Sequence, residues 1–484
     1  MSAPNRDGVP TITSPIVKPT CFYGEEKFCF INIDGKFDGW ENRSHGNLWA
    51  FNQNYMEWLN QELLLDEDAE QWIDRYIVDM SNNAIGNDPY VTALRCMNWI
   101  RLFCLKPHLR TQEREDALFS QMVLMDKRLE FKLLGNHLLE EIFALFIASV
   151  YFNHQPWFDK SKTLMMEQLN EQILKDGAHY ELSPMYQCIL LDRLLDCCNY
   201  SINNKIFVGQ EELTTLMKDK AVLMLGHLKS IIYQNGSIPL LNDAARGIGP
   251  EANELFDYAM RLGLTWQAIP LTRCGYRKMK KGRMEAIVDI SQIRATYQPG
   301  HTHADFFTYE LRIDGNPFIV DTGTSTYDKG PRRDYERSTK AHNTVSVEGK
   351  DSCEVWSGFR VGKRPKIHIE ADFGDEIQAW HLGFGRGLKH TRYFAMREDG
   401  LKVIDDVSKS CDSISYLHFA EGINVELSED LCKLLTPTAD VIIHGAKKIE
   451  ISDDFYAEEY NRMKKCKVVA IHFDRHLEYK ISIR

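Results

Sequence analysis

The spacing of apolar residues changes part-way along this chain of 484 residues, and that change limits the folds available to it. From about residue 45 to 270, apolar residues recur every three or four positions, as at Val91, Leu94 and Met97. Beyond about residue 285 they alternate with polar residues, which is typical of strands with one buried face. The sequence therefore predicts a helical domain followed by a strand-rich domain, and not a parallel α/β sheet.

The helical half is divided by loops that contain Gly, Pro and Asn. Helical spacing covers Trp49 to Leu63, Val91 to Leu102, and about 114–132, 137–152, 160–175, 185–200, 211–233 and 251–262. Many antiparallel helices with short connections are typical of a helical toroid or bundle.

Two Asp-Gly pairs in the second half lie between alternating runs and predict hairpins. The runs are 307–314 and 316–322 around Asp314-Gly315, and 393–397 and 401–405 around Asp399-Gly400.

Residues 274–283 (CGYRKMKKGR) are basic, contain glycine, and are predicted to link the two halves. We therefore expect an α+β multidomain protein in three parts: an N-terminal extension (1–44), a helical domain (45–280) and an antiparallel β-sandwich (281–484).

The composition is that of a soluble globular protein without general attraction to polyanions. The chain is 44% hydrophobic and 26% charged, and its apolar runs are too short to cross a bilayer. A net charge of −11 argues against a nucleic-acid partner. An acidic polysaccharide would have to be bound by a local basic patch. The sequence leaves open whether the chain forms homo-oligomers.

The N-terminal residues predict a cytoplasmic protein. Met1 to Asp7 contain no basic region that leads into an apolar stretch, so we expect no secretory signal in this chain. If a leader had been removed, a periplasmic or secreted location would apply instead. The 12 cysteines lack the pattern of a disulfide scaffold and are interpreted as mostly reduced thiols.

Three histidines and an aspartate occur close to predicted strands. His301 and His303 are two positions apart, so on extended chain their side chains point the same way. Asp321 follows an apolar strand, and His342 opens another. Two imidazoles and a carboxylate from separate strands form a suitable zinc site. The alternative is that these residues are hydrogen-bonded surface or core side chains.

Two helix starts also contain polar residues. Asn136 precedes an apolar helix and could simply be its N-cap. Ser183 and Pro184 form a strong helix start, which places Tyr186 in the first turn, where the helix dipole favours a phenolate. Tyr186 could equally be a packing residue.

Taken together and in order, five motifs resemble the heparinase II/III-like lyases and their alginate-lyase relatives. They are GNHLLEE (135–141), DGAHYELSPMY (176–186), GHTHAD (300–305), FIVDTGTSTY (318–327) and RSTKAHNTVSVEG (337–349). The resemblance implies an (α/α) toroid followed by an antiparallel β-sandwich, with the active site in the cleft between them. It implies a polysaccharide lyase that removes the C5 proton of a uronic acid, expels the 4-linked sugar by β-elimination, and acts on alginate-like or glycosaminoglycan-like polymers.

The resemblance also implies roles for single residues. Asn136 and His137 match donors that neutralise the substrate carboxylate. Tyr186 matches the tyrosine that acts as acid, and in some members as base, and His301 matches its partner. The positions that match the ligands of a mainly structural zinc ion are His303, Asp321 and His342.

Substrate binding is assigned to basic residues and one acid. Carboxylate or sulfate groups could be bound by Arg246, Arg332, Arg333 and Arg337, unless these are only surface charges. Glu181 is placed with this substrate-binding group. Glu181 and Asp243 suit orienting groups or helix-terminus partners better than catalytic acids.

Several alternatives remain open. The negative net charge and the absence of a secretory signal favour alginate-, hyaluronan- or capsule-type uronates, or short oligosaccharides, over heparin as the substrate. Rival functions are a uronate C5-epimerase, a glycoside hydrolase using Glu181 and Asp243, and a glycan-binding protein without turnover.

Overall fold

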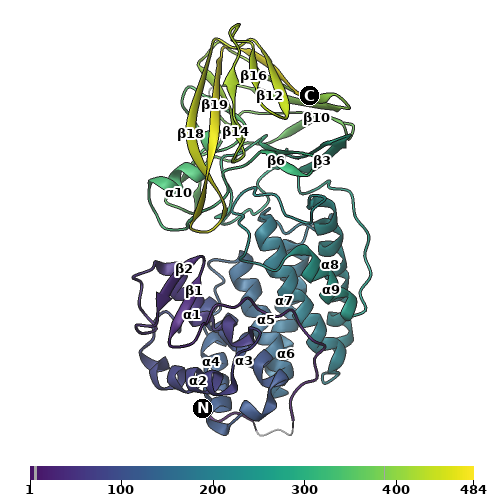
Figure 1. Ribbon diagram of the computed structural model, residues 1–484. Helices are drawn as coiled ribbons and strands as arrows, with labels where there is room; N and C mark the ends of the chain where they lie inside the picture. The colour runs from purple at the N-terminus through teal and green to yellow at the C-terminus, as the bar shows by residue number, and fades with distance from the viewer. Residues whose placement is uncertain (5–7, 386) are drawn as a thin grey trace. The chain divides into compact units, whose positions relative to one another are not determined.

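The computed structural model describes residues 1–4, 8–385 and 387–484. Residues 5–7, part of the segment from which the absence of a secretory signal was predicted, lie outside the described residues. The chain forms two compact units, shown in Figure 1. Unit 1 comprises residues 1–177, 188–225 and 249–267, and unit 2 comprises 178–187, 226–248 and 268–484. The division into 1–44, 45–280 and 281–484 stays a prediction.

Unit 1 is mainly helical. Its helices are α1 (Asn47–Tyr55), α2 (Asp66–Asp79), α3 (Pro89–Leu105), α4 (Gln112–Asp126), α5 (Gly135–Phe152), α6 (Gln155–Gln172), α9 (Ala252–Arg261) and most of α7 (Pro184–Asn203) and α8 (Gln210–Ile231), with a hairpin of β1 (Lys27–Phe30) and β2 (Ile33–Lys36). Helix α5 packs against both α3 and α6 and is buried almost all round, which explains its nearly continuous apolar sequence. Among the described residues, no helix is long and apolar enough to cross a membrane.

Unit 2 contains two large antiparallel sheets. The order in one is β10 (His368–Asp372), β11 (Glu376–His381), β12 (His390–Arg397), β13 (Gly400–Val407), β20 (His476–Ile483), β17 (Ala439–His444), β16 (Lys433–Leu435) and β15 (Glu426–Leu427). The order in the other is β18 (Lys448–Glu459), β19 (Arg462–Phe473), β14 (Ser413–Phe419), β6 (Asn316–Ile319), β5 (Tyr309–Ile313), β4 (Met284–Asp289) and β3 (Tyr276–Lys281), with β7 (Val345–Val347) also on β14. Residues from both sheets, such as Leu311 and Val403, share one apolar core, so the predicted sandwich is confirmed.

Most predicted elements are present. Both Asp-Gly hairpins are confirmed, as β5–β6 and β12–β13. The predicted linker at 274–283 is wrong, because residues 276–281 form strand β3 at the edge of a sheet. Met279 lies in the apolar core shared by the two sheets, and Tyr276 is buried elsewhere, with its hydroxyl accepting a hydrogen bond from Asn242 at 3.0 Å. The four basic residues of the strand are partly or fully exposed, as is common on edge strands. Helix α2 was not predicted.

Candidate functional site

A buried carboxylate in unit 2 organises several of the predicted site residues. Asp243 lies in the loop between α8 and α9 and is fully buried. Its two oxygens accept hydrogen bonds from both terminal nitrogens of Arg333, at 2.5 and 2.7 Å. Burial raises the pKa of Asp243, but the Arg333 guanidinium and His303 outweigh it and hold that pKa well below its usual range. Asp243 is therefore an ionised hydrogen-bond acceptor.

Two histidines share this carboxylate. His301 Nδ1 lies 2.9 Å from Asp243 Oδ2, and His303 Nε2 lies 2.7 Å from Oδ1. Thr324 Oγ1 donates to Oδ1 at 3.2 Å. His303 is fully buried, whereas the His301 side chain is 12% exposed. The two histidines of the GHTHAD motif thus have one partner but different access to solvent.

Tyr186 lies against the accessible histidine. The ring centres of Tyr186 and His301 are 4.1 Å apart, and the Tyr186 hydroxyl is 3.3 Å from that of Tyr327. Ser183 Oγ accepts from the Tyr186 backbone N–H, so the predicted N-cap is confirmed. Burial raises the pKa of the Tyr186 phenol, which keeps the hydroxyl protonated. A half-buried phenol beside an imidazole is suited to proton transfer.

The Arg333 guanidinium completes this network. It lies 4.9 Å from the ring centre of Tyr327 and also donates to the carbonyl of Gly358. Sequence reasoning did not single out Tyr327 or Thr324, although both belong to the FIVDTGTSTY motif.

Unusual backbone conformations precede the candidate residues. Leu182 and Asn242 have φ of 56° and 57° and lie just before Ser183 and Asp243. In unit 1, Leu134 before the α5 motif has φ 56° and ψ −149°, a region that only glycine adopts readily. Strained backbone of this kind is found at functional sites more often than elsewhere.

The predicted zinc ligands lie near one another and are fully buried. His342 Nδ1 is 2.8 Å from Asp321 Oδ2, and the rings of His303 and His342 are 5.3 Å apart. His303 Nδ1 and His342 Nε2 have no hydrogen-bond partner among the residues that the structure describes. Buried imidazole nitrogens without partners are costly, so the chemistry of this group fits a bound metal ion.

The charge states of these histidines differ. Burial lowers the pKa of His303 to about 4. Burial also lowers the pKa of His342, but the Asp321 carboxylate outweighs it and raises that pKa to about 9.

Other buried ligand-type atoms in unit 2 were not predicted. Within the described part of the chain, Asp305 Oδ2 and His418 Nε2 also have no hydrogen-bond partner. The ligand atoms of His227 and Cys274, both buried, lie within 4.8 Å of each other. No spacing signal in the sequence indicates these residues.

The arginines assigned to substrate binding have protein partners. Arg337 is buried and donates to the carbonyls of Thr302, Trp356 and Arg360. Arg246 is 27% exposed and lies 3.3 Å from a Glu458 carboxylate oxygen. For Arg333 and Arg337 these contacts favour a role in holding loops, and their binding of substrate stays a prediction.

Glu181 lies near His301 Nε2, the ring nitrogen that does not contact Asp243. It is buried, and its Oε2 is 3.9 Å from both His301 Nε2 and His179 Nδ1. This position fits the orienting role expected for Glu181.

In unit 1, Asn136 and His137 lie in the first turn of α5. Helix α5 begins at Gly135, with Leu134 at its N-cap position, so the N-cap interpretation of Asn136 is wrong. Asn136 is buried, and His137 Nδ1 lies 2.9 Å from Glu130 Oε2. The His137 ring is 4.4 Å from the ring of Tyr90.

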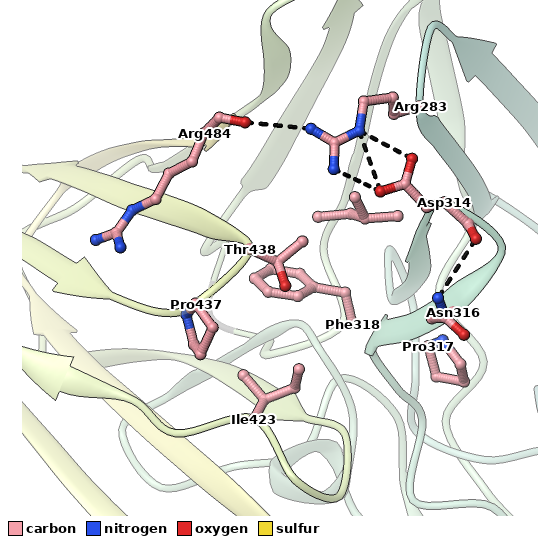
Figure 2. Close-up of a pocket in the computed structure, with 10 residues that line it drawn as sticks. Arg283, Asp314, Asn316, Pro317, Phe318, Ile423, Pro437, Thr438 and Arg484 are labelled. Atoms are coloured by element: carbon pink, nitrogen blue, oxygen red, sulfur yellow. Dashed lines mark hydrogen bonds and ion pairs between the residues drawn. The ribbon is translucent and has the colours of Figure 1, made fainter.

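A separate pocket of unit 2 has a different character. Its volume is about 280 Å³. Figure 2 shows the side chains that line it, among them Phe318, Ile423 and Pro437. Its charged side chains are already paired: Arg283 with Asp314, and Arg484 with Asp440 outside the pocket. It contains none of the predicted site residues.

The chain has a helical region followed by antiparallel sheets, and its histidines, tyrosines and an arginine are clustered. Comparison with known families identifies the class of protein to which this arrangement belongs. The chain belongs to the heparinase II/III-like family. Residues 123–255 match the model described as "Heparinase II/III N-terminus", and residues 264–484 match "Heparinase II/III-like, C-terminal".

Two curated relatives are named heparin-sulfate lyase. The protein of Bacteroides stercoris is 24% identical over 318 residues, which are 59% of this chain and 45% of that protein. The protein of Pedobacter heparinus is 23% identical over 247 residues, 45% of this chain and 36% of that protein. The chain thus matches less than half the length of each.

Solved structures share the fold. A crystal structure of heparinase III has a TM-score of 0.73 at 15% identity and covers 92% of this chain and 79% of that one. The chondroitin AC lyase of Streptomyces coelicolor, solved with chondroitin sulphate, has a TM-score of 0.54 at 10% identity, with 90% and 74% covered. The predicted fold class is confirmed.

Proposed function

We propose that this protein is a polysaccharide lyase that cleaves uronic-acid-containing glycosaminoglycans by β-elimination. The observation that carries the proposal is the Tyr186–His301 pair, in which an imidazole anchored by Asp243 lies 4.1 Å, ring to ring, from a protonated phenol. Membership of the heparinase II/III-like family and the names of the curated relatives support the same reaction.

The chemistry explains why these residue types are needed. A proton next to a carboxylate is barely acidic, because the carbanion places a second negative charge beside the first. In our proposal His301 Nε2 accepts the C5 proton, and the Tyr186 hydroxyl donates a proton to the leaving 4-oxygen. The family motif implies that Asn136 and His137 are donors that neutralise the carboxylate and stabilise the enolate, and their part in the reaction stays a prediction.

A zinc ion would be held by His303, Asp321 and His342. When bound, it would tie together the loops that carry these residues and so contribute stability, not proton transfer. The partnerless nitrogens of His303 and His342 support this assignment.

Two observations favour one class of uronate substrate: the names of the curated relatives and the net charge of this chain. The relatives' names favour a glycosaminoglycan. The candidate arginines are largely occupied by protein partners, and the net charge is −11, which together favour low sulfation over heparin.

The test is a panel of heparan sulfate, chondroitin sulfate, hyaluronan, alginate and short oligomers, followed by ultraviolet absorbance of the C4–C5 double bond. We expect unsaturated product from at least one glycosaminoglycan and its loss in Tyr186→Phe. Saturated ends would indicate a hydrolase. Incorporation of deuterium at C5 without cleavage, after incubation in heavy water, would indicate an epimerase. Binding of the polymer without turnover would contradict the proposal that the protein is an enzyme.

A further inference from the structure

The buried carboxylate of Asp243 contacts two imidazoles through chemically different nitrogens. It meets Nδ1 of His301 at 2.9 Å and Nε2 of His303 at 2.7 Å. Because the carboxylate is paired with the Arg333 guanidinium through both oxygens, it is ionised and can only accept hydrogen bonds. Each facing nitrogen must therefore carry a hydrogen.

In the tautomer that this contact selects for each ring, the other nitrogen carries a lone pair, and the two lone pairs lie in different surroundings. His301 Nε2 belongs to the partly exposed ring beside Tyr186 and lies 3.9 Å from Glu181 Oε2. His303 Nδ1 is buried and has no hydrogen-bond partner in residues 1–4, 8–385 and 387–484. One lone pair is available to a substrate proton, and the other is available only to a buried cation.

We propose that Asp243 is a positioning residue that fixes His301 and His303 in opposite tautomers, so that one histidine accepts a proton and the other is a metal ligand. The inference rests on the proposed lyase function and deepens it. It explains how two histidines only two residues apart can have separate roles, and why the mechanism needs a carboxylate that never touches the sugar.

Asp243 itself is held from several sides. Its backbone N–H donates to the carbonyl of His301 at 3.1 Å, and its own carbonyl accepts from Ser183 Oγ. Arg333 and Thr324 occupy the remaining acceptor positions. The loops that carry Tyr186 and His301 are therefore both tied to the residue that orients the imidazole.

Unit 2 offers a matched control. Asp405 likewise accepts two hydrogen bonds from one arginine, Arg392, and one from a histidine, His390 Nε2 at 2.8 Å. All three residues are fully buried in the sandwich domain. A substitution there removes a similar ion pair from a carboxylate whose hydrogen-bond partners, Arg392, His390 and Ser415, are not candidate site residues.

The first experiment compares Asp243→Asn, Asp243→Glu and Asp405→Asn. For Asp243→Asn we expect kcat to fall about 100-fold with little change in KM, and zinc affinity to fall about 10-fold, as is usual when a partner of a ligating histidine is lost. Asp243→Glu should recover part of both. Folded Asp405→Asn should keep wild-type kcat and zinc affinity. Unchanged kcat and zinc affinity in folded Asp243→Asn would overturn the proposal, as would equal losses in Asp405→Asn.

A second measurement needs no substitution of Asp243. Nuclear magnetic resonance of isotope-labelled imidazole nitrogens distinguishes the two tautomers, and the signals are assigned by their loss in His301→Gln and His303→Gln. We expect His301 to be protonated on Nδ1 and metal-free His303 on Nε2. The same tautomer at both positions would overturn the proposal. This result is independent of turnover, so absence of lyase activity with opposite tautomers would contradict the proposed function alone.

Discussion

Unit 2 contains two Asp–Arg–His clusters of nearly the same composition and quite different surroundings. In one, Asp405 binds Arg392 and His390, and His390 Nδ1 lies 3.3 Å from His381 Nε2, with all side chains fully buried. In the other, Asp243 binds Arg333 and His301, and His301 is 12% exposed. The hydrogen-bonding groups are alike, and only the second cluster presents an imidazole to the outside.

The difference shows that a cluster of ion-paired side chains is not in itself a candidate catalytic site. Around Asp405 the second nitrogen of the histidine faces another histidine, and Arg392 donates to the carbonyls of Phe307 and Asn343, so the cluster ties strands and loops together. Around Asp243 the histidine faces Tyr186. We therefore expect the first cluster to control stability and the second to control turnover.

The largest expected effect is on turnover. Tyr186→Phe removes the proposed acid and should lower kcat by about 10²–10⁴-fold, the usual contribution of a general acid or base. The thermal midpoint should stay close to that of the wild type, because the ring and its contact with His301 are kept. Kinetics on the most active polymer and a melting curve measure both.

The control for this substitution is Tyr309→Phe in the sandwich, where the hydroxyl lies 3.2 Å from that of Tyr479. This variant should lose stability and keep kcat. If Tyr186→Phe keeps full activity, the assignment of the acid is wrong.

The next largest effect is on stability and concerns the Asp405 cluster. Asp405→Asn leaves the buried Arg392 without its counter-charge, which should lower the free energy of unfolding by about 3–5 kcal/mol. Denaturant unfolding measures the loss, and activity per folded molecule should be unchanged. A variant as stable as the wild type would remove the distinction drawn between the clusters.

Zinc should have a smaller effect, and on stability first. At a free concentration 100 times its Kd, the ion should stabilise the protein by about 2.7 kcal/mol if it binds only the folded state. Chelation should lower the melting temperature, and zinc should restore it. His303→Ala should abolish the response, whereas an equal response in this variant would contradict the ligand assignment.

The smallest effect concerns the buried carboxyl group of Glu141 in unit 1. Burial raises the pKa of Glu141 to about 9; a hydrogen bond from the Glu130 backbone N–H opposes this shift, and the Glu130 carboxylate adds to it. The folded state therefore favours the protonated form, whose stability is fully present below the unfolded pKa of about 4.5 and is lost as pH rises towards about 9.

Glu141→Gln should remove this dependence, because the amide can replace the protonated carboxyl. The stability advantage of the variant should grow by about 1 kcal/mol between about pH 7 and about pH 8. Denaturant unfolding at both values tests this, and parallel curves for variant and wild type would count against it.

Periodicity predicted much of the fold, and it was least informative where charged residues dominate. Hairpins and most helices follow from local patterns. Strand β3 was mistaken for a linker because lysines and arginines occupy its exposed positions. The N-cap assigned to Asn136 failed because Leu134 takes a left-handed backbone that no local pattern indicates.

The candidate site was predictable only through the family motifs. His301, His303 and Arg333 lie 58, 60 and 90 residues from Asp243 along the chain, so no spacing rule could place them on one carboxylate. The contacts of that carboxylate come from separate loops of unit 2 and depend on how these loops fold together.

In the proposed reaction, the Tyr186–His301 pair performs elimination. The most direct measurement is mass spectrometry of a cleaved uronate oligosaccharide after digestion in water enriched in the heavy oxygen isotope. We predict unsaturated non-reducing ends with no solvent oxygen in either product, and no cleavage by Tyr186→Phe. Saturated products that carry one solvent oxygen would show hydrolysis and contradict elimination by this pair.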